Sequence, residues 1–140
     1  MSHANVLADF QPLERESPYS DLTGPFLEGP SSEGVYRLAL RIEERHLNNL
    51  GVAHGGILMT LADNAVGVAV ARALVEPAAV VTVSLNNEFL NSARLGDFVV
   101  AESRILKQGG RLLFVDCLLS VGDRPVLHSS AIMSKVKRPA

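Results

Sequence analysis

Apolar residues fill nearly every position from Ile57 to Val75. Such a run predicts a long helix that is buried on all sides. The pair Gly55-Gly56 marks its start and Pro77 marks its end, because proline cannot continue a helix. The run approaches the length of a membrane span, but polar residues interrupt it. A helix in the core of a soluble protein is therefore the better interpretation.

Beyond this helix the hydrophobic period changes to two. One side of the first strand holds Val81, Val83, Leu85 and Phe89, and the other side holds Thr82, Ser84, Asn86 and Glu88. This alternation predicts one core face and one polar face. Further strands are predicted at 98–106, 112–121 and 126–136, joined by glycine-containing hairpin links, and one more at 34–42 before the helix. One strand, a helix and four strands in a meander predict an α+β fold in which an antiparallel sheet wraps the helix.

The first 33 residues hold four of the seven prolines, with serines, glycines and acids between them. This composition resists regular structure apart from one short helix. We therefore expect residues 1–33 to form an irregular lead-in and residues 34–140 to form a single domain. The N-terminus lacks the basic and then apolar pattern of a secretory signal, so we expect a cytoplasmic protein.

Composition excludes several classes of function. A chain of 140 residues with 47% hydrophobic residues makes one domain with a substantial core. The formal net charge of -2 comes from scattered charges, which argues against nucleic acid as a partner. The single Cys117 lies among apolar residues and is expected to be packing material. The histidines have no ligand spacing, so no metal site is expected.

Asp63 is the one acid within the apolar helix. An ionised carboxylate in such surroundings costs several kcal/mol unless it is paired or solvated. The residue therefore indicates a functional site.

The residues around the start of the helix form a distinctive motif. Asn48, Gly51 and His54-Gly55-Gly56 precede the helix, and Leu61-Ala62-Asp63-Asn64 lies within it. The segments Val81-Thr82-Val83-Ser84-Leu85-Asn86 and Ala93-Arg94-Leu95-Gly96-Asp97 follow. With this motif and this order of elements, residues 34 to 137 resemble the hotdog-fold acyl-CoA thioesterases of the phenylacetate-pathway (PaaI-like) group.

The resemblance implies a long central helix wrapped by a five- to six-stranded antiparallel sheet. It also implies hydrolysis of an acyl-CoA thioester without metal or cofactor, at sites built by two subunits, commonly in paired dimers. Asn48 and Gly55 match the positions at the thioester carbonyl, with His54 beside them. Asp63 matches the carboxylate that activates water or attacks directly, and Thr82 matches a hydroxyl that helps to orient the water.

The residue types suit this chemistry. Thioester hydrolysis places negative charge on the carbonyl oxygen, and the Gly55 N–H at a helix start is a fixed donor for it. An ionised Asp63 can act as a general base or as a nucleophile, and the sequence leaves both routes open. No Gly-x-Ser-x-Gly elbow is present as an alternative. A histidine in the position of His54 more often caps the helix than transfers protons.

Helix geometry predicts a site shared between subunits. Nine residues separate His54 from Asp63, which is a rotation of about 900° and a rise of roughly 13 Å. The two ends cannot converge within one chain, so two subunits must contribute if both act on one thioester. The small or polar stripe Gly56, Thr60, Asp63 and Gly67 leaves room for a partner or ligand, although close helix packing would also explain it.

Coenzyme A carries phosphates, and the candidate cations for them are Lys107, Arg111 and Arg94. Ordinary solvated charge is the alternative for each of them. Because no glycine-rich nucleotide fingerprint is present, we expect recognition in a surface groove.

A non-catalytic acyl-CoA sensor or carrier on the same fold is the alternative function. A hydratase fits less well, because the His-Phe-Pro-Gly and His-x-Asp patterns of such hotdog relatives are absent. The sequence leaves open the type of acyl group and the choice between dimer and tetramer.

Overall fold

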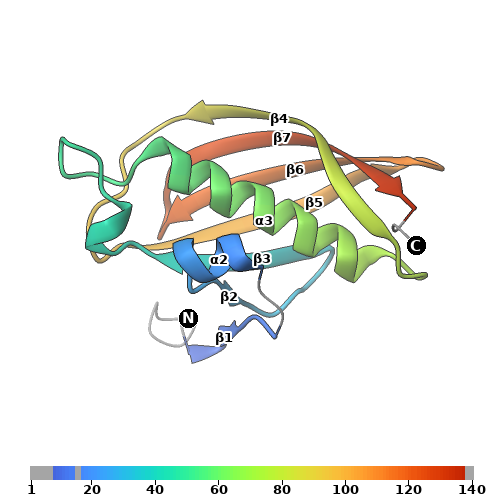
Figure 1. Cartoon of the computed structure of the whole chain (residues 1–140), viewed down its shortest axis with the longest axis horizontal. Coiled ribbons are helices and arrows are strands. Elements are labelled where there is room, and N and C mark those ends of the chain that lie inside the picture. Colours follow the sequence, from blue (N-terminus) through green and yellow to red (C-terminus); the bar gives the residue numbers. More distant parts are fainter. Residues whose placement is uncertain (1–7, 15–16, 138–140) are drawn as a thin grey trace.

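The computed structural model describes residues 8–14 and 17–137 and consists of one long helix on one face of a curved antiparallel sheet (Figure 1). The elements are β1 (Gln11–Pro12), α2 (Pro18–Thr23), β2 (Leu27–Glu28), β3 (Val35–Arg41), a 3-10 turn η1 (Glu44–His46), α3 (Gly55–Ala73), β4 (Ala79–Phe89), β5 (Phe98–Gln108), β6 (Leu112–Val121) and β7 (Arg124–Val136). The α+β class and the five strands predicted around the helix are confirmed.

The sheet has seven strands in the order β1-β2-β3-β5-β6-β7-β4, and every pairing is antiparallel. The predicted meander of four strands is wrong for β4, which pairs with β7 rather than with β5. Alternation along a strand reports its buried face but not its neighbour. This pairing makes β4 an edge strand of the described sheet.

The helix α3 forms the centre of the core. It packs against β3, β5, β6, β4 and β7. Its buried side chains include Leu61, Val66 and Val70, which join Leu113 and Leu119 of β6 in one cluster. The helix is long and apolar enough to cross a membrane by length and composition alone. The sheet buries one side of the helix, including Leu61 and Val66, whereas Met59 and Ala71 are exposed, so the prediction of a helix buried on all sides is wrong.

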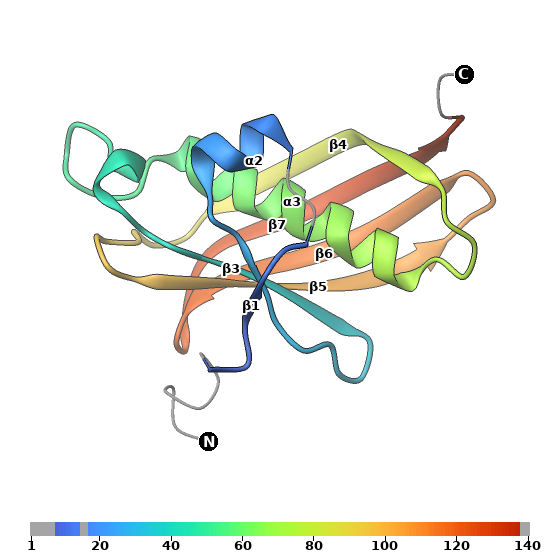
Figure 2. The same ribbon diagram turned by 60° about the horizontal axis from the view of Figure 1, so that its bottom comes forward.

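The described part of the lead-in is more regular than predicted. The short helix is present as α2, but β1 and β2 also extend the sheet beyond β3. Phe26 is fully buried, and Tyr19 Oη lies 3.1 Å from Thr60 Oγ1 of α3. Figure 2 shows α2 lying along α3. Tertiary contacts therefore order a segment whose local composition favours irregular structure; residues 1–7 and 15–16 lie outside the described range.

A bulge in β4 corrects the predicted faces of this strand. The register with β7 shifts between Thr82 and Ser84, so that Thr82 pairs with Met133 and Leu85 with Ala131. Directly paired residues share a face, and both of these partners are buried. Thr82 therefore lies on the helix-facing side with Leu85, although strict alternation predicted opposite sides. One extra residue in a strand inverts the phase of the side chains that follow it.

Cys117 is a free, buried thiol in β6. Burial raises its pKa to about 12, so the thiol stays protonated at neutral pH. The predicted role as packing material is consistent with both observations.

Candidate active site

Asp63 and Thr82 are held together in the structure. The Thr82 hydroxyl donates a hydrogen bond of 2.6 Å to Asp63 Oδ1 across the gap between α3 and the edge strand β4. Asp63 is half-buried, and no cation within the described residues forms an ion pair with it. The acid is therefore held in place, and its second oxygen has no hydrogen-bond partner among the described residues.

The acid faces an open groove, which we name the α3 groove. Its volume is about 500 Å³, its floor is α3, and its walls are α2 with Leu13 on one side and the start of β4 on the other. The polar lining includes Ser17, Ser20, Asp63, Asn64 and Thr82. Solvation in this groove explains how a long apolar helix can carry an acid.

The N-terminal end of α3 is arranged around His54. The Gly56 N–H donates to His54 Nδ1 at 2.8 Å, so the histidine is the N-cap of the helix. Because Nδ1 accepts, a neutral ring carries its proton on Nε2. The capping role expected from the sequence is confirmed.

The Gly55 N–H is a free donor at this helix start. No residue in the described ranges accepts a hydrogen bond from it, as expected for the first turn of a helix. A cavity of about 280 Å³, lined by Gly55, Leu58 and Phe89 among others, lies beside it. A Cβ on Gly55 would lie 3.1 Å from the Phe89 ring, so a side chain at this position would crowd the cavity.

Asn48 organises the loop before the helix. Its Oδ1 accepts from the N–H groups of Leu50 and Val52 at 2.9 and 3.2 Å. Gly51, in the same loop, has a φ of 80°, a conformation that glycine adopts without strain. Because Oδ1 already accepts two hydrogen bonds, the side-chain amide Nδ2–H of Asn48 is left as a donor toward other groups.

The structure gathers the predicted residues at two separate places. Asn48, His54 and Gly55 lie at the start of α3, whereas Asp63 and Thr82 lie two turns further on, about 12 Å along the axis from Gly55. Both places border β4, through Phe89 at one end and Thr82 at the other.

Comparisons with known proteins show the family of this chain. Residues 50–128 match the family model described as the Thioesterase superfamily, which is more than half of the chain. The chain belongs to the Thioesterase superfamily. A Pseudomonas aeruginosa protein that is named as an esterase is 42% identical to this chain over 128 residues. The match covers 91% of this chain and 96% of that protein. Human acyl-coenzyme A thioesterase 13 is 36% identical over 75 residues, about half of each chain.

Solved structures confirm the fold of this thioesterase. The PaaI protein of Escherichia coli superimposes with a TM-score of 0.77 at 20% identity, covering 86% of both chains. A Streptococcus pneumoniae thioesterase solved with coenzyme A gives 0.73 at 22% identity, covering 82% of this chain and 88% of that chain. The predicted hotdog fold and the resemblance to the PaaI-like group are confirmed, and thioester hydrolysis is the general activity of the family.

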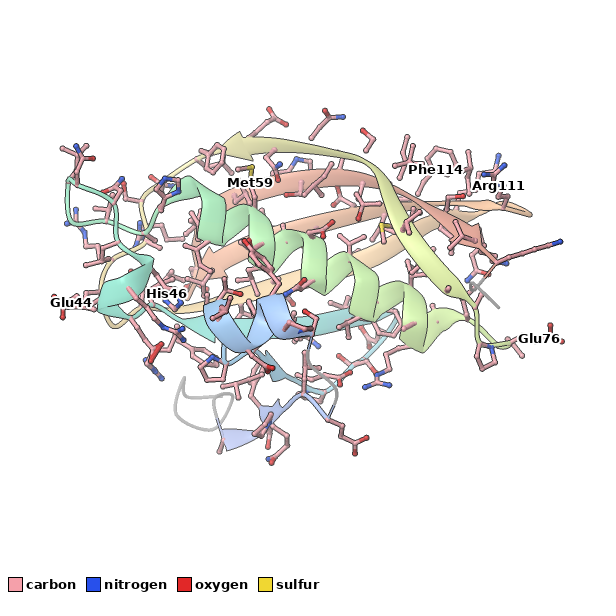
Figure 3. All side chains as sticks on the ribbon, in the orientation of Figure 1. Glu44, His46, Met59, Glu76, Arg111 and Phe114 are labelled. Carbon is pink, nitrogen blue, oxygen red and sulfur yellow. The ribbon has the colours of Figure 1, made fainter. Side chains whose placement is uncertain are left out.

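The candidate phosphate-binding cations of this thioesterase lie in different places. Arg94 forms an isolated bridge with Val52, beside the Asn48 loop. Lys107 is at the β5–β6 end, and Arg111 Nε donates to Ser134 Oγ at 3.1 Å. Figure 3 places Arg111 at the end of the molecule away from Met59 in the early turns of α3. Of these three candidates, Arg94 is therefore the one near the Gly55 end within one protomer.

Sequence reasoning missed the contribution of the lead-in. Leu13, Ser17 and Ser20 line the α3 groove, and Tyr19 covers Thr60. Their local sequence gives no indication of this contact; the buried Ser20 and the exposed Tyr19 of α2 become meaningful only once α2 lies on α3. In the described part of the thioesterase, no group of three or more His, Cys, Asp or Glu side chains could hold a metal ion.

Proposed function

We propose that this thioesterase hydrolyses an acyl-CoA at a site shared by two copies of the chain. The observation that carries the proposal is the pair of Asp63 and Thr82 in an open groove, with the unpaired Gly55 N–H on the same helix. Asp63 can activate water and the Gly55 N–H can polarise a carbonyl, but the two are too far apart to act together within one chain.

The edge strand β4 supports the choice of a second copy as partner. Its Val81, Val83 and Phe89 are 49%, 59% and 52% exposed, and Leu90 beyond it is 49% exposed. An exposed apolar edge strand is a template for pairing with another strand. In a symmetric dimer the same strand would supply both halves of that interface.

Antiparallel pairing of β4 with its copy would also complete the site. If the two-fold axis passes between Leu85 and Asn86, the partner's Thr82 lies opposite Phe89. Phe89 borders the Gly55 cavity and Thr82 holds Asp63. This register would therefore bring the partner's Asp63 toward the carbonyl end of the first protomer, and two-fold symmetry would generate two such sites.

The chemistry follows from the groups at hand. The Gly55 N–H and the Asn48 side-chain amide would donate to the thioester carbonyl oxygen, where negative charge develops. Removal of one such donor costs about 3 to 4 kcal/mol in comparable sites. Asp63, oriented by Thr82, would take a proton from water as the water oxygen attacks the acyl carbon. The C–S bond then breaks, and the CoA thiolate leaves and is protonated.

The alternative to this general-base route begins with attack by Asp63 itself. Its carboxylate would form a mixed anhydride and release CoA, and water would then hydrolyse the anhydride. Arg94 is the cation placed to meet CoA phosphate near Gly55, whereas Lys107 and Arg111 would have to come from another subunit.

Free thiol release from acyl-CoA tests the proposal. Purified protein should release thiol from some acyl-CoA, and Asp63→Asn should lower kcat at least about a hundredfold without unfolding the protein. Equal rates for the two proteins would reject the catalytic role of Asp63. Tight acyl-CoA binding without thiol release would favour a sensor or carrier instead.

A further inference from the structure

The α3 groove continues beyond Asp63 in only one direction along the helix. Asp63, Gly67 and Ala71 follow each other at intervals of four residues and therefore share one helix face. On the N-terminal side of Asp63, Tyr19 of α2 covers Thr60. On the C-terminal side the groove lies over Gly67 and Ala71. No described residue of α3 before Asp63 lines the groove, so an acyl chain bound in it would extend from Asp63 toward the C-terminal end of α3.

Gly67 leaves unused space in the floor of the groove. A Cβ built at this position would meet no atom within 4 Å. Alanine is more favourable than glycine in a helix interior by about 1 kcal/mol. The fold of the single chain therefore does not require glycine here, whereas a molecule in the groove would gain room from it.

The lining beyond Asp63 is aliphatic. Leu13, Val68, Ala71 and Val80 line the groove, and none of the described residues in its lining is aromatic. A second cavity of about 440 Å³ shares Leu13, Val68 and Ala71 with the groove and continues past them to Leu74. The path is long and lacks a ring on which an aryl group could stack.

We propose that the α3 groove holds the acyl group of the substrate as an extended aliphatic chain, and that Gly67 and then Ala71 determine how far the chain can reach. This inference rests on the proposed function, since it starts from a thioester carbon placed at Asp63. Leu13 of the lead-in forms the outer wall of the path. Gly67 and Ala71 are thus specificity-determining residues rather than catalytic ones.

Helix geometry relates the length of the acyl chain to positions along the groove. Gly67 lies one turn and Ala71 two turns from Asp63, at about 6 and 12 Å along the axis. Each C–C bond of about 1.5 Å advances an extended chain by about 1.3 Å. Counting the thioester carbon as the first, a chain would therefore pass Gly67 at about its sixth carbon and Ala71 at about its tenth. Further on, Arg72 at the second cavity is held by Glu28 through hydrogen bonds of 2.8 and 2.7 Å.

Two leucine substitutions in the full-length protein test whether Gly67 and Ala71 limit the length of the acyl chain. The measurement is kcat/KM for thiol release from acetyl-, butyryl-, hexanoyl-, octanoyl-, decanoyl-, dodecanoyl- and phenylacetyl-CoA. We expect wild type to prefer the longer linear chains to phenylacetyl-CoA. Gly67→Leu should lower kcat/KM at least about tenfold from hexanoyl-CoA upward, while acetyl-CoA changes less than about threefold. Ala71→Leu should do the same only from decanoyl-CoA upward.

The controls separate blocking from general damage. Ser130→Leu, at an exposed position of β7 that does not line the groove, should leave the chain-length profile as in wild type. Circular dichroism should show all variants folded, and Gly67→Ala should not lower Tm. A flat wild-type profile, a preference for phenylacetyl-CoA, or equal losses on all chain lengths would overturn the inference alone. No thiol release by wild type from any ester would overturn the proposed function as well.

Discussion

The hydrogen bond between Thr82 and Asp63 gives a prediction with a calculable size. Its length of 2.6 Å and its acceptor, a carboxylate, make it a charge-assisted bond. Bonds to charged groups contribute about 1.5 to 3 kcal/mol. One decade of rate corresponds to about 1.36 kcal/mol, so loss of the bond should cost between about 10- and 150-fold in rate.

Thr82→Val removes the hydroxyl and keeps the branched shape of the side chain. We expect kcat for acyl-CoA hydrolysis to fall within that range while KM changes less than about threefold, because Thr82 holds the acid and not the substrate. Thr82→Ser keeps the hydroxyl and should stay within about threefold of wild type. Circular dichroism should show both variants folded, so that a lower kcat reports the lost bond. A Thr82→Val enzyme with wild-type kcat would refute a positioning role for this bond.

Three further predictions concern the surface and the core. Val83→Lys places a charge on the exposed edge of β4, so we expect smaller particles in analytical ultracentrifugation and a parallel loss of activity; an unchanged mass with full activity would place the interface elsewhere. Asp116, whose Oδ1 lies 2.7 Å from His128 Nε2, and then Glu88 raise the pKa of His128 above its ordinary 6.5. The two ion pairs therefore stabilise the fold below pH 6.5, and this stabilisation is lost as the pH rises through the folded-state pKa of His128. The free energy of unfolding in urea should therefore differ by less than about 1 kcal/mol between wild type and His128→Gln, and this difference should shrink from pH 6 to pH 9. A difference that grows with pH would contradict the assignment. Cys117, buried with a pKa of about 12, should react with an aromatic disulfide reagent at neutral pH only after denaturant is added, and rapid reaction of the folded protein would contradict its burial.

The parts of the fold that follow from local sequence were predictable. The start of α3 is at Gly55, where the glycine pair marked it, and β6 spans the predicted residues 112–121. These boundaries depend on glycine, proline and hydrophobic period, which act within a few residues of each other. The same logic identified Asp63, because an acid in an apolar helix requires a local reason.

The remaining features depend on contacts between distant residues. The bulge at Thr82 and Ser84 changes which side of β4 faces the helix, and the alternation of residue types did not reveal it. The place of β4 beside β7 follows from how the sheet closes around α3. The lead-in is ordered by burial of Phe26 and by the contact between Tyr19 and Thr60, which no local pattern encodes. Within the site, sequence found the separate groups and the stripe of Asp63 and Gly67 that leaves room for a ligand, and the structure added the walls of the groove, which α2, Leu13 and the start of β4 supply.

Subunit complementation tests the shared site most directly. Asn48→Ala disables the carbonyl end and Asp63→Ala disables the acid, so each homodimer should be nearly inactive. After subunit exchange, half of the dimers in a statistical mixture are mixed, and each mixed dimer has one intact site of two. Thiol release should therefore return to about a quarter of the wild-type rate. Exchange verified by mass spectrometry without recovery of activity would contradict the account, because it would mean that each chain acts alone.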